Sequence, residues 1–123
     1  MCVLITQRKA GGLYPGYWEF PGGKVDQGET VDSCVIRELN EEVGISAIVF
    51  GFLSDVEYAY PHGKVRLHPR LCRMADGSAE PRDLHVAAHR WVRPEELSSY
   101  RFPEANESIV RELLDALSRG VAS

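Results

Sequence analysis

The sequence lacks the features that mark membrane-spanning, secreted and disulfide-stabilised proteins. No apolar run approaches the roughly 20 residues that a membrane-spanning helix needs, and no basic stretch followed by an apolar one marks a leader. The three cysteines, Cys2, Cys34 and Cys72, are odd in number and widely spaced, which fits neither a disulfide framework nor a zinc site. We therefore expect a cytoplasmic protein with reduced thiols.

Positive charge is also scarce. The chain has 14 Lys and Arg against 18 Asp and Glu, a formal net charge of −4. A surface that binds a nucleic acid polymer needs a basic stripe, so this balance argues against such a partner. It still allows a small polyphosphate substrate if metal ions neutralise the site. The length of 123 residues and the absence of repeats or linkers predict a single domain, 1–123.

An amphipathic helix is predicted near the middle of the first half of the chain. Thr30 is suited to cap its start, and Gly44 is suited to a left-handed residue that ends it. Apolar residues recur every four positions, as one buried face of a helix requires. The expected buried stripe consists of Val31, Val35, Leu39 and Val43, with Ile36 beside it.

Three carboxylates share an arc of this helix. Glu38, Glu41 and Glu42 stand at offsets that bring them within an arc of roughly 100°. Like charges so placed cost an isolated helix about 0.2–0.5 kcal/mol per pair, which predicts a cation among them. Oxygen ligands of high charge density suit Mg²⁺ or Mn²⁺. The alternative interpretation is a solvated acidic face without a ligand.

The surrounding residues favour the metal. They fill the pattern G-x5-E-x7-R-E-U-x-E-E-x-G-U, where U is aliphatic, with Gly23, Glu29, Arg37, Glu38, Leu39, Glu41, Glu42, Gly44 and Ile45. This pattern resembles the signature of the Nudix hydrolases, which hydrolyse a nucleoside diphosphate linked to another group. The resemblance implies an α+β fold, an α/β/α sandwich with a mixed sheet, the signature helix and a C-terminal helix. It also implies a first strand that this sequence lacks.

The resemblance implies roles for the signature residues. The expected metal ligands are the carbonyl of Gly22 and the carboxylates of Glu38, Glu41 and Glu42. Glu38 or Glu41 is expected to orient or deprotonate the attacking water, and Arg37 to orient the glutamates. Glu29 is expected to brace the junction between loop and helix.

A loop residue before the last strand is a further catalytic candidate. Many relatives carry a glutamate where this chain has His85. A neutral imidazole can accept a proton or bind a metal but adds no negative charge. Asp83 is an alternative source of a carboxylate, and a surface histidine without a role is the other interpretation.

Three stretches outside the signature, 5–8, 19–24 and 102–107, are similar to the MutT-like branch, which hydrolyses purine nucleoside triphosphates including 8-oxo-dGTP. The expected substrate contacts are Arg8, Glu19, Phe20, Gly22, Gly23 and Asn106. Arg8 can bond phosphate, Phe20 can face the base, and Asn106 can read a purine edge. Alternatively, Arg8 faces solvent, Phe20 belongs to the core and Asn106 caps the last helix.

Two other functions remain open. The stretches 65–68 and 18–20 also resemble the CTP-type pyrimidine triphosphatases. A non-catalytic Nudix-like recognition module is the third possibility, although such modules generally lose signature glutamates. The sequence leaves open whether the protein is a monomer or a homodimer.

The remaining elements are read from apolar runs and turn residues. Strands are expected at 3–6, 18–20, 47–52, 56–60, 65–74 and 89–92, with Pro69 marking an edge or bulge. A short helical turn is expected at 94–97, and a closing helix at 109–117 that Gly120 ends.

Overall fold

The computed structural model describes residues 2–119. Its strands are β1 (Val3–Gln7), β2 (Trp18–Glu19), β3 (Ala47–Phe52), β4 (Val56–Tyr60), β5 (Gly63–Leu67), β6 (Arg70–Met74) and β7 (Ala88–Val92). Its helices are α1 (Val31–Val43), the 3₁₀ turns η1 (Pro94–Ser99) and η2 (Glu104–Asn106), and α2 (Glu107–Ser118). None of the helices in this part of the chain is long and apolar enough to cross a membrane.

The strands form three ladders. β1 lies between β2 and β7, β3 pairs with β6, and β4 pairs with β5 in a hairpin. The predicted α+β class is confirmed. Every ladder among residues 2–119 is antiparallel, so the parallel pair of the expected mixed sheet is not among them.

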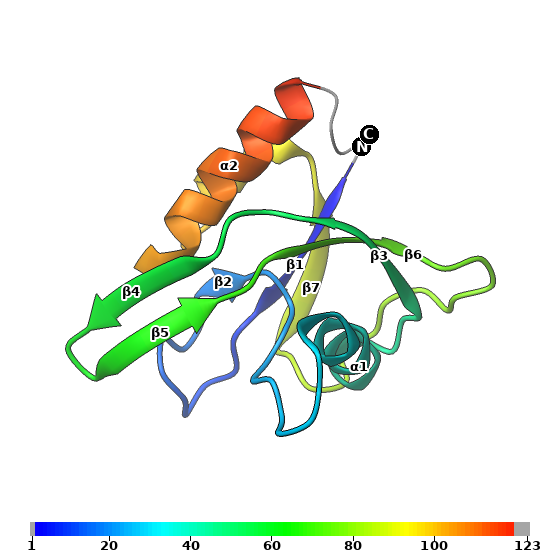
Figure 1. Ribbon diagram of the computed structural model, residues 1–123, viewed down its shortest axis with the longest axis horizontal. Coiled ribbons are helices and arrows are strands. Elements are labelled where there is room, and N and C mark those ends of the chain that lie inside the picture. The colour runs from blue at the N-terminus through cyan, green and yellow to red at the C-terminus, as the bar shows by residue number, and fades with distance from the viewer. Residues whose placement is uncertain (1, 120–123) are drawn as a thin grey trace.

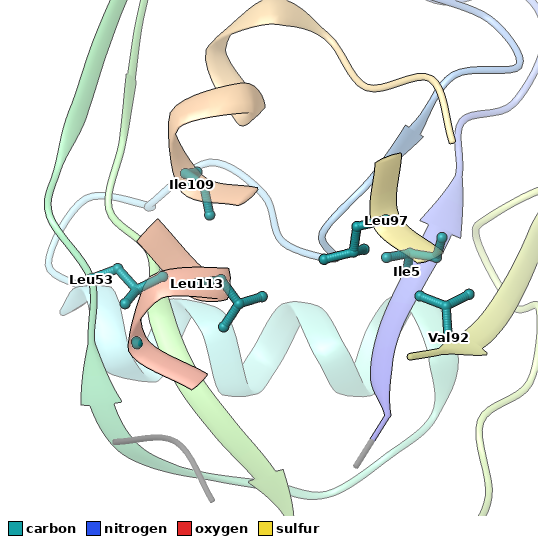
Figure 2. Close-up of a cluster of buried hydrophobic side chains, with 7 residues drawn as sticks. Ile5, Leu53, Val92, Leu97, Ile109 and Leu113 are labelled. Carbon is teal, nitrogen blue, oxygen red and sulfur yellow. The ribbon is translucent and has the colours of Figure 1, made fainter. Parts of the chain in front are cut away.

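The two helices lie on opposite sides of the strands (Figure 1). Alternate residues of a strand point to opposite faces, and β1 uses both. Ile5 joins the cluster under α2, which Figure 2 shows, whereas Leu4 packs against the cluster under α1. This is the predicted α/β/α sandwich, with β1 at its centre.

Helix α1 has the predicted bounds for the predicted reasons. Thr30 accepts a hydrogen bond from the N–H of Ser33, and the Ser33 side chain bonds the N–H of Thr30 in return. Gly44 ends the helix at φ 72°, a left-handed conformation that glycine adopts without strain.

The buried face of α1 differs from the predicted stripe at two positions. Ile36 is 40% exposed, and Cys34 is 2% exposed. Cys34 is covered because the loop before α1 folds back over it, with its Sγ 3.7 Å from the carbonyl of Gly23. Ile36 lies at the far edge of the apolar arc, where no such loop covers it.

Pro69 divides the single strand expected at 65–74. β5 ends at Leu67 and β6 begins at Arg70, so the prediction of one strand there is wrong. Proline has no N–H to donate to a ladder, whereas its carbonyl accepts from Leu53 at 3.3 Å. The break lets β5 pair with β4 and β6 pair with β3.

The C-terminal elements agree with the prediction. The helical turn at 94–97 is η1, and the closing helix is α2, which begins two residues earlier than expected. Gly120, the predicted stop, lies outside the described residues.

Candidate active site

β1 and β2 bring the first pair of candidate residues together. Thr6 faces Glu19 in the ladder, so Arg8 follows β1 close to the Glu19 carboxylate. Nη1 of Arg8 lies 2.6 Å from Oε1 of Glu19, and its Nε donates to the carbonyl of Leu13 at 2.7 Å. Burial raises the pKa of Glu19, an effect that Arg8 opposes. Arg8 is therefore anchored in the site rather than pointing freely into solvent.

Arg37 of α1 contacts several acidic side chains of the signature. Its guanidinium binds both oxygens of Glu29, with Nε–Oε2 at 2.7 Å and Nη2–Oε1 at 3.0 Å. Its Nη1 lies 2.8 Å from Glu38 and 3.1 Å from Glu41. The planar fork of arginine suits this arrangement, since it binds one carboxylate at two points and still reaches others. One cation thus holds three acidic side chains of the signature, and its Nη2 also lies 3.3 Å from Asp26.

The Gly22 turn reaches the last glutamate of the signature. The N–H of Gly22 donates to Oε2 of Glu42 at 3.0 Å. The pKa of Glu42 is raised to about 8, chiefly by burial and then by the charges of Glu19, Glu38 and Glu41. The N–H of Gly22 opposes that rise but does not cancel it. Glu42 is therefore a carboxylate that lacks sufficient positive charge around it.

Gly23 and Glu38 are in close contact. A Cβ added at Gly23 would lie 2.4 Å from the carboxyl carbon of Glu38, which is too close for two carbon atoms. Gly22, in contrast, has open space where its Cβ would be. A side chain in the first place of the signature would force the Glu38 carboxylate to move, because this flexible end of the side chain lies directly against the backbone there.

The loop before β7 is attached to the end of α1. The N–H groups of Leu84 and His85 both donate to the carbonyl of Glu42, at 3.1 and 3.0 Å. The last carbonyls of a helix have no partner within the helix, and this loop supplies donors to them. His85 is thereby held beside Glu42. Asp83, the alternative loop carboxylate, instead lies 2.6 Å from Nδ1 of His89.

A cleft of about 240 Å³ opens over these residues. Its lining consists of Gln7, Arg8, Lys9, Gly12, Leu13, Glu19, Glu42, His85 and Val86. The cleft unites the predicted residues Arg8, Glu19, Glu42 and His85. Sequence reasoning missed the other five lining residues, which are Gln7, Lys9, Gly12, Leu13 and Val86. Lys9 had a detectable signal, since it is a second cation directly after Arg8.

The candidate base-binding residues lie outside the cleft, Phe20 directly after β2 and Asn106 at the end of η2. Phe20 stacks on Phe102 with ring centroids 5.3 Å apart, and both pack against the core cluster under α2. The N–H of Trp18 donates to the carbonyl of Arg101 at 2.7 Å, which brings the 101–106 segment beside β2. Phe20 is thus partly a core residue, as the alternative interpretation held.

Asn106 stands at the start of α2 without capping it. Its side chain makes no capping hydrogen bond, which removes the alternative interpretation of this residue as a helix cap. Neither Asn106 nor Phe20 lines the cleft, so the candidate residues fall into a carboxylate group and a separate aromatic-amide group.

The carboxylate group has the chemistry of a hard-cation site. Among residues 2–119 no three acidic, His or Cys side chains already converge as ligands, because Arg37 holds Glu38 and Glu41 while Gly22 holds Glu42. The pKa of Glu42 is raised first by burial and then by the neighbouring carboxylates, and a divalent cation would favour its charged form. All the donors are oxygens, which suits Mg²⁺ or Mn²⁺. The residues fit the metal after rotation of their side chains.

Comparisons with known proteins agree with the signature. Residues 2–112 match the family model of the NUDIX domain. The chain is 35% identical to the 8-oxo-dGTP diphosphatase of Escherichia coli, over 90% of this chain and 84% of that protein. It is 30% identical to the CTP pyrophosphohydrolase of E. coli, over 85% of this chain and 76% of that protein.

A solved structure has the same fold. The solution structure of the E. coli ORF135 protein superposes with a TM-score of 0.80 at 26% identity, covering 99% of this chain and 86% of that one. The family model and this superposition thus agree on one family and on its fold.

Proposed function

We propose that this protein uses Mg²⁺ to hydrolyse a nucleoside triphosphate to a monophosphate and pyrophosphate. The proposal proceeds from the finding that the chain belongs to the Nudix family and is a nucleotide pyrophosphohydrolase. An oxidised purine such as 8-oxo-dGTP is the proposed substrate. The prediction of an enzyme rather than a non-catalytic recognition module is confirmed.

The observation that carries the metal-dependent proposal is the environment of Glu42. Its pKa of about 8 results from burial beside three other glutamates, one of which, Glu19, comes from a different element. Without a cation such a group takes up a proton, whereas a bound cation would favour its charged form. A polyphosphate chain needs that same cation to screen its charge. The acidic cluster and the anionic substrate therefore become compatible through one metal centre.

In this proposal, Glu38, Glu41, Glu42 and the carbonyl of Gly22 hold Mg²⁺, for which Mn²⁺ can substitute. The bound ion would neutralise phosphate charge and lower the pKa of the attacking water. Arg37 keeps Glu38 and Glu41 oriented on the same side of α1. Its bonds to Glu29 fix the guanidinium itself, since that pair links the loop to the helix.

The water needs a proton acceptor, and three groups are available. Glu38 and Glu41 lie on the metal helix, while His85 lines the cleft from the opposite loop. We assign His85 to hold or accept the proton of the water, because the imidazole is a base that keeps no negative charge near the substrate.

The substrate phosphates would lie along the cleft near Arg8 and Lys9, with Glu19 fixing the position of Arg8. Gly22 has open space where its Cβ would be, and this would let the phosphate chain approach the backbone closely there. The base would rest against Phe20, and the amide of Asn106 would read its edge with one donor and one acceptor.

The test is pyrophosphate release from 8-oxo-dGTP, dGTP, CTP and 5-methyl-dCTP with Mg²⁺, measured side by side. A large preference in kcat/KM for 8-oxo-dGTP over dGTP is the expected result. Absence of turnover with every triphosphate, with Mg²⁺ or Mn²⁺ present, would contradict the proposal and direct the search to nucleotide sugars and dinucleotides.

A pyrimidine triphosphate is the second candidate. The relative named CTP pyrophosphohydrolase covers 85% of this chain, and both candidates share the same carboxylate chemistry. The two candidates differ at the base, and CTP also carries a ribose. A preference for CTP or 5-methyl-dCTP in the same panel would select this alternative.

We further propose that residues 1–123 act as one catalytic domain in the cytoplasm, where nucleotide pools are found. No nucleic acid polymer or membrane partner is needed for this activity. The carboxylates, Arg37 and the cleft all come from one chain, so the reaction needs no second copy, and both a monomer and a homodimer are compatible with it.

A further inference from the structure

Two tyrosines of β4 hold the η2 turn that carries Asn106. Tyr60 is buried, and its hydroxyl oxygen accepts a hydrogen bond from the N–H of Ala105 at 2.7 Å. The hydroxyl of Tyr58 bonds the carboxylate of Glu104. Alternate residues of a strand share a face, so both side chains point from β4 toward the same turn. The two residues directly before Asn106 are thus attached to an element more than forty residues away.

The η2 turn has little internal support. It contains three residues, and the N–H of Asn106 donates to the carbonyl of Pro103 at 2.9 Å. Hydrogen bonds in 3₁₀ turns have poorer geometry than those in α-helices. The Asn106 side chain makes no capping bond to α2 that would fix it. The orientation of the Asn106 side-chain amide therefore depends on the position of Ala105, whose backbone N–H donates to the hydroxyl of Tyr60.

Tyr60 is itself fixed by the aromatic rings around it. Its ring stacks on His62 at 5.0 Å with an interplanar angle of 17°, and it contacts Tyr58 at 4.7 Å and Tyr14 at 5.5 Å. Tyr14 belongs to the loop that follows β1, and the others belong to the β4–β5 hairpin. The hydroxyl of Tyr60 consequently has a defined position from which to hold the turn.

We propose that Tyr60, assisted by Tyr58, is a positioning residue that orients Asn106 for recognition of the nucleobase. The inference rests on the proposed function, in which Asn106 reads the base edge. Tyr60 touches the backbone of the turn and not the substrate, so it governs base discrimination without taking part in phosphate chemistry.

The decisive variant is Tyr60→Phe, which removes one hydroxyl group and keeps the ring packing. It leaves the buried N–H of Ala105 without its acceptor, so we expect kcat/KM for the preferred nucleotide to fall about ten-fold. The loss should appear in KM, with kcat nearly unchanged. Deoxyribose 5′-triphosphate without a base should be hydrolysed as by the parent enzyme. An equal loss on both substrates would overturn the inference.

Tyr100→Phe is the matched control, because it removes a tyrosine hydroxyl from a ring that packs on Trp18, outside the hairpin-to-turn contact. It should leave the preference among bases unchanged. A loss of preference equal to that of Tyr60→Phe would overturn the inference, since it would show a general effect of hydroxyl removal.

A double-mutant cycle with Asn106→Ala separates the inference from the proposed function. If Tyr60 acts through Asn106, Tyr60→Phe should cause no further loss of discrimination once Asn106 is removed. Additive losses would overturn the inference. Unchanged discrimination in Asn106→Ala alone would instead overturn the proposed role of Asn106, and the inference with it.

Hydrogen exchange supplies a test that needs no substrate. The amide of Ala105 should exchange slowly in the parent protein and at least ten-fold faster in Tyr60→Phe, while amides in the centre of α2 remain unchanged. Equal exchange of the Ala105 amide in both proteins would show that Tyr60 does not hold the turn, even if the enzyme proved inactive on every nucleotide tried.

Discussion

Arg37 binds both carboxylate oxygens of Glu29, at 2.7 and 3.0 Å, and Glu29 lies eight positions earlier, just before the cap of α1. The pair joins the start of the signature to its helix and turns the remaining Nη1 donor toward the metal-ligand candidates Glu38 and Glu41. One guanidinium of the signature thus binds both a structural partner, Glu29, and two candidate metal ligands, Glu38 and Glu41.

This ion pair predicts a specific dependence of stability on pH. The hydrogen bonds from Arg37 and then the N–H of Asp26 lower the pKa of Glu29 from 4.5 to about 2. Between these values the unfolded chain binds more protons, so stability falls as the pH falls. The contribution of Glu29 should be complete above about pH 4.5 and lost as the pH drops through about 2.

The measurement is the free energy of unfolding in urea for the parent and Glu29→Gln between pH 7 and 2.5. The parent should be more stable by a constant amount above pH 5, and the difference should shrink below it. Glu57→Gln removes a lowered-pKa carboxylate from the exposed hairpin and is the control, expected to have a smaller effect. A difference as large at pH 2.5 as at pH 7 would refute the assignment.

Gly23 offers a test of the loop-to-helix contact. In Gly23→Ala the new Cβ would meet the carboxyl carbon of Glu38 at 2.4 Å, so either the loop or the glutamate must move. We expect the Mg²⁺ concentration for half-maximal activity to rise about ten-fold or more, as for changes around metal ligands. Gly22→Ala enters open space and keeps the backbone carbonyl, so its effect should be clearly smaller. Equal effects of the two changes would argue against the contact.

Glu42→Gln tests the metal centre directly. The change keeps the shape and the acceptor for the N–H of Gly22 but removes the charge, so kcat/KM should fall at least about 100-fold. A chelator should abolish parental activity, and added Mg²⁺ should restore it. Glu80→Gln changes an exposed loop carboxylate and should be without effect. Activity of Glu42→Gln close to that of the parent would rule out this residue as a ligand.

The elements of this fold that depend on nearby residues were predictable from the sequence. The bounds of α1 follow from Thr30, Gly44 and the four-residue apolar period, and strands 47–52 and 56–60 follow from apolar runs bounded by turns. Ile36 was wrongly placed beside the buried stripe, and the buried Cys34 was not included in it, because a loop folds over Cys34 and not over Ile36.

Contacts between distant segments were not predictable in the same way. The attachment of His85 to the carbonyl of Glu42 and of Ala105 to Tyr60 depends on how loops fold onto helices and strands. No local period or turn signal reports such contacts. Asp83 remained a candidate in the sequence for this reason, and only the structure shows its carboxylate beside His89.

We therefore expect opposite effects on kcat from substitutions at the two loop residues, His85 and Asp83. His85 lines the cleft and is held beside Glu42, whereas the carboxylate of Asp83 lies 2.6 Å from His89. His85→Ala should lower kcat at least about ten-fold if the imidazole accepts the proton of the water. Asp83→Asn should leave kcat within about two-fold of the parent value, since Asp83 lies outside the cleft. The change should lower stability only by the small amount typical of exposed ion pairs. Steady-state kinetics at saturating Mg²⁺ would compare them. A large loss in Asp83→Asn with none in His85→Ala would transfer the role to the carboxylate, and would require the loop to rearrange when substrate binds.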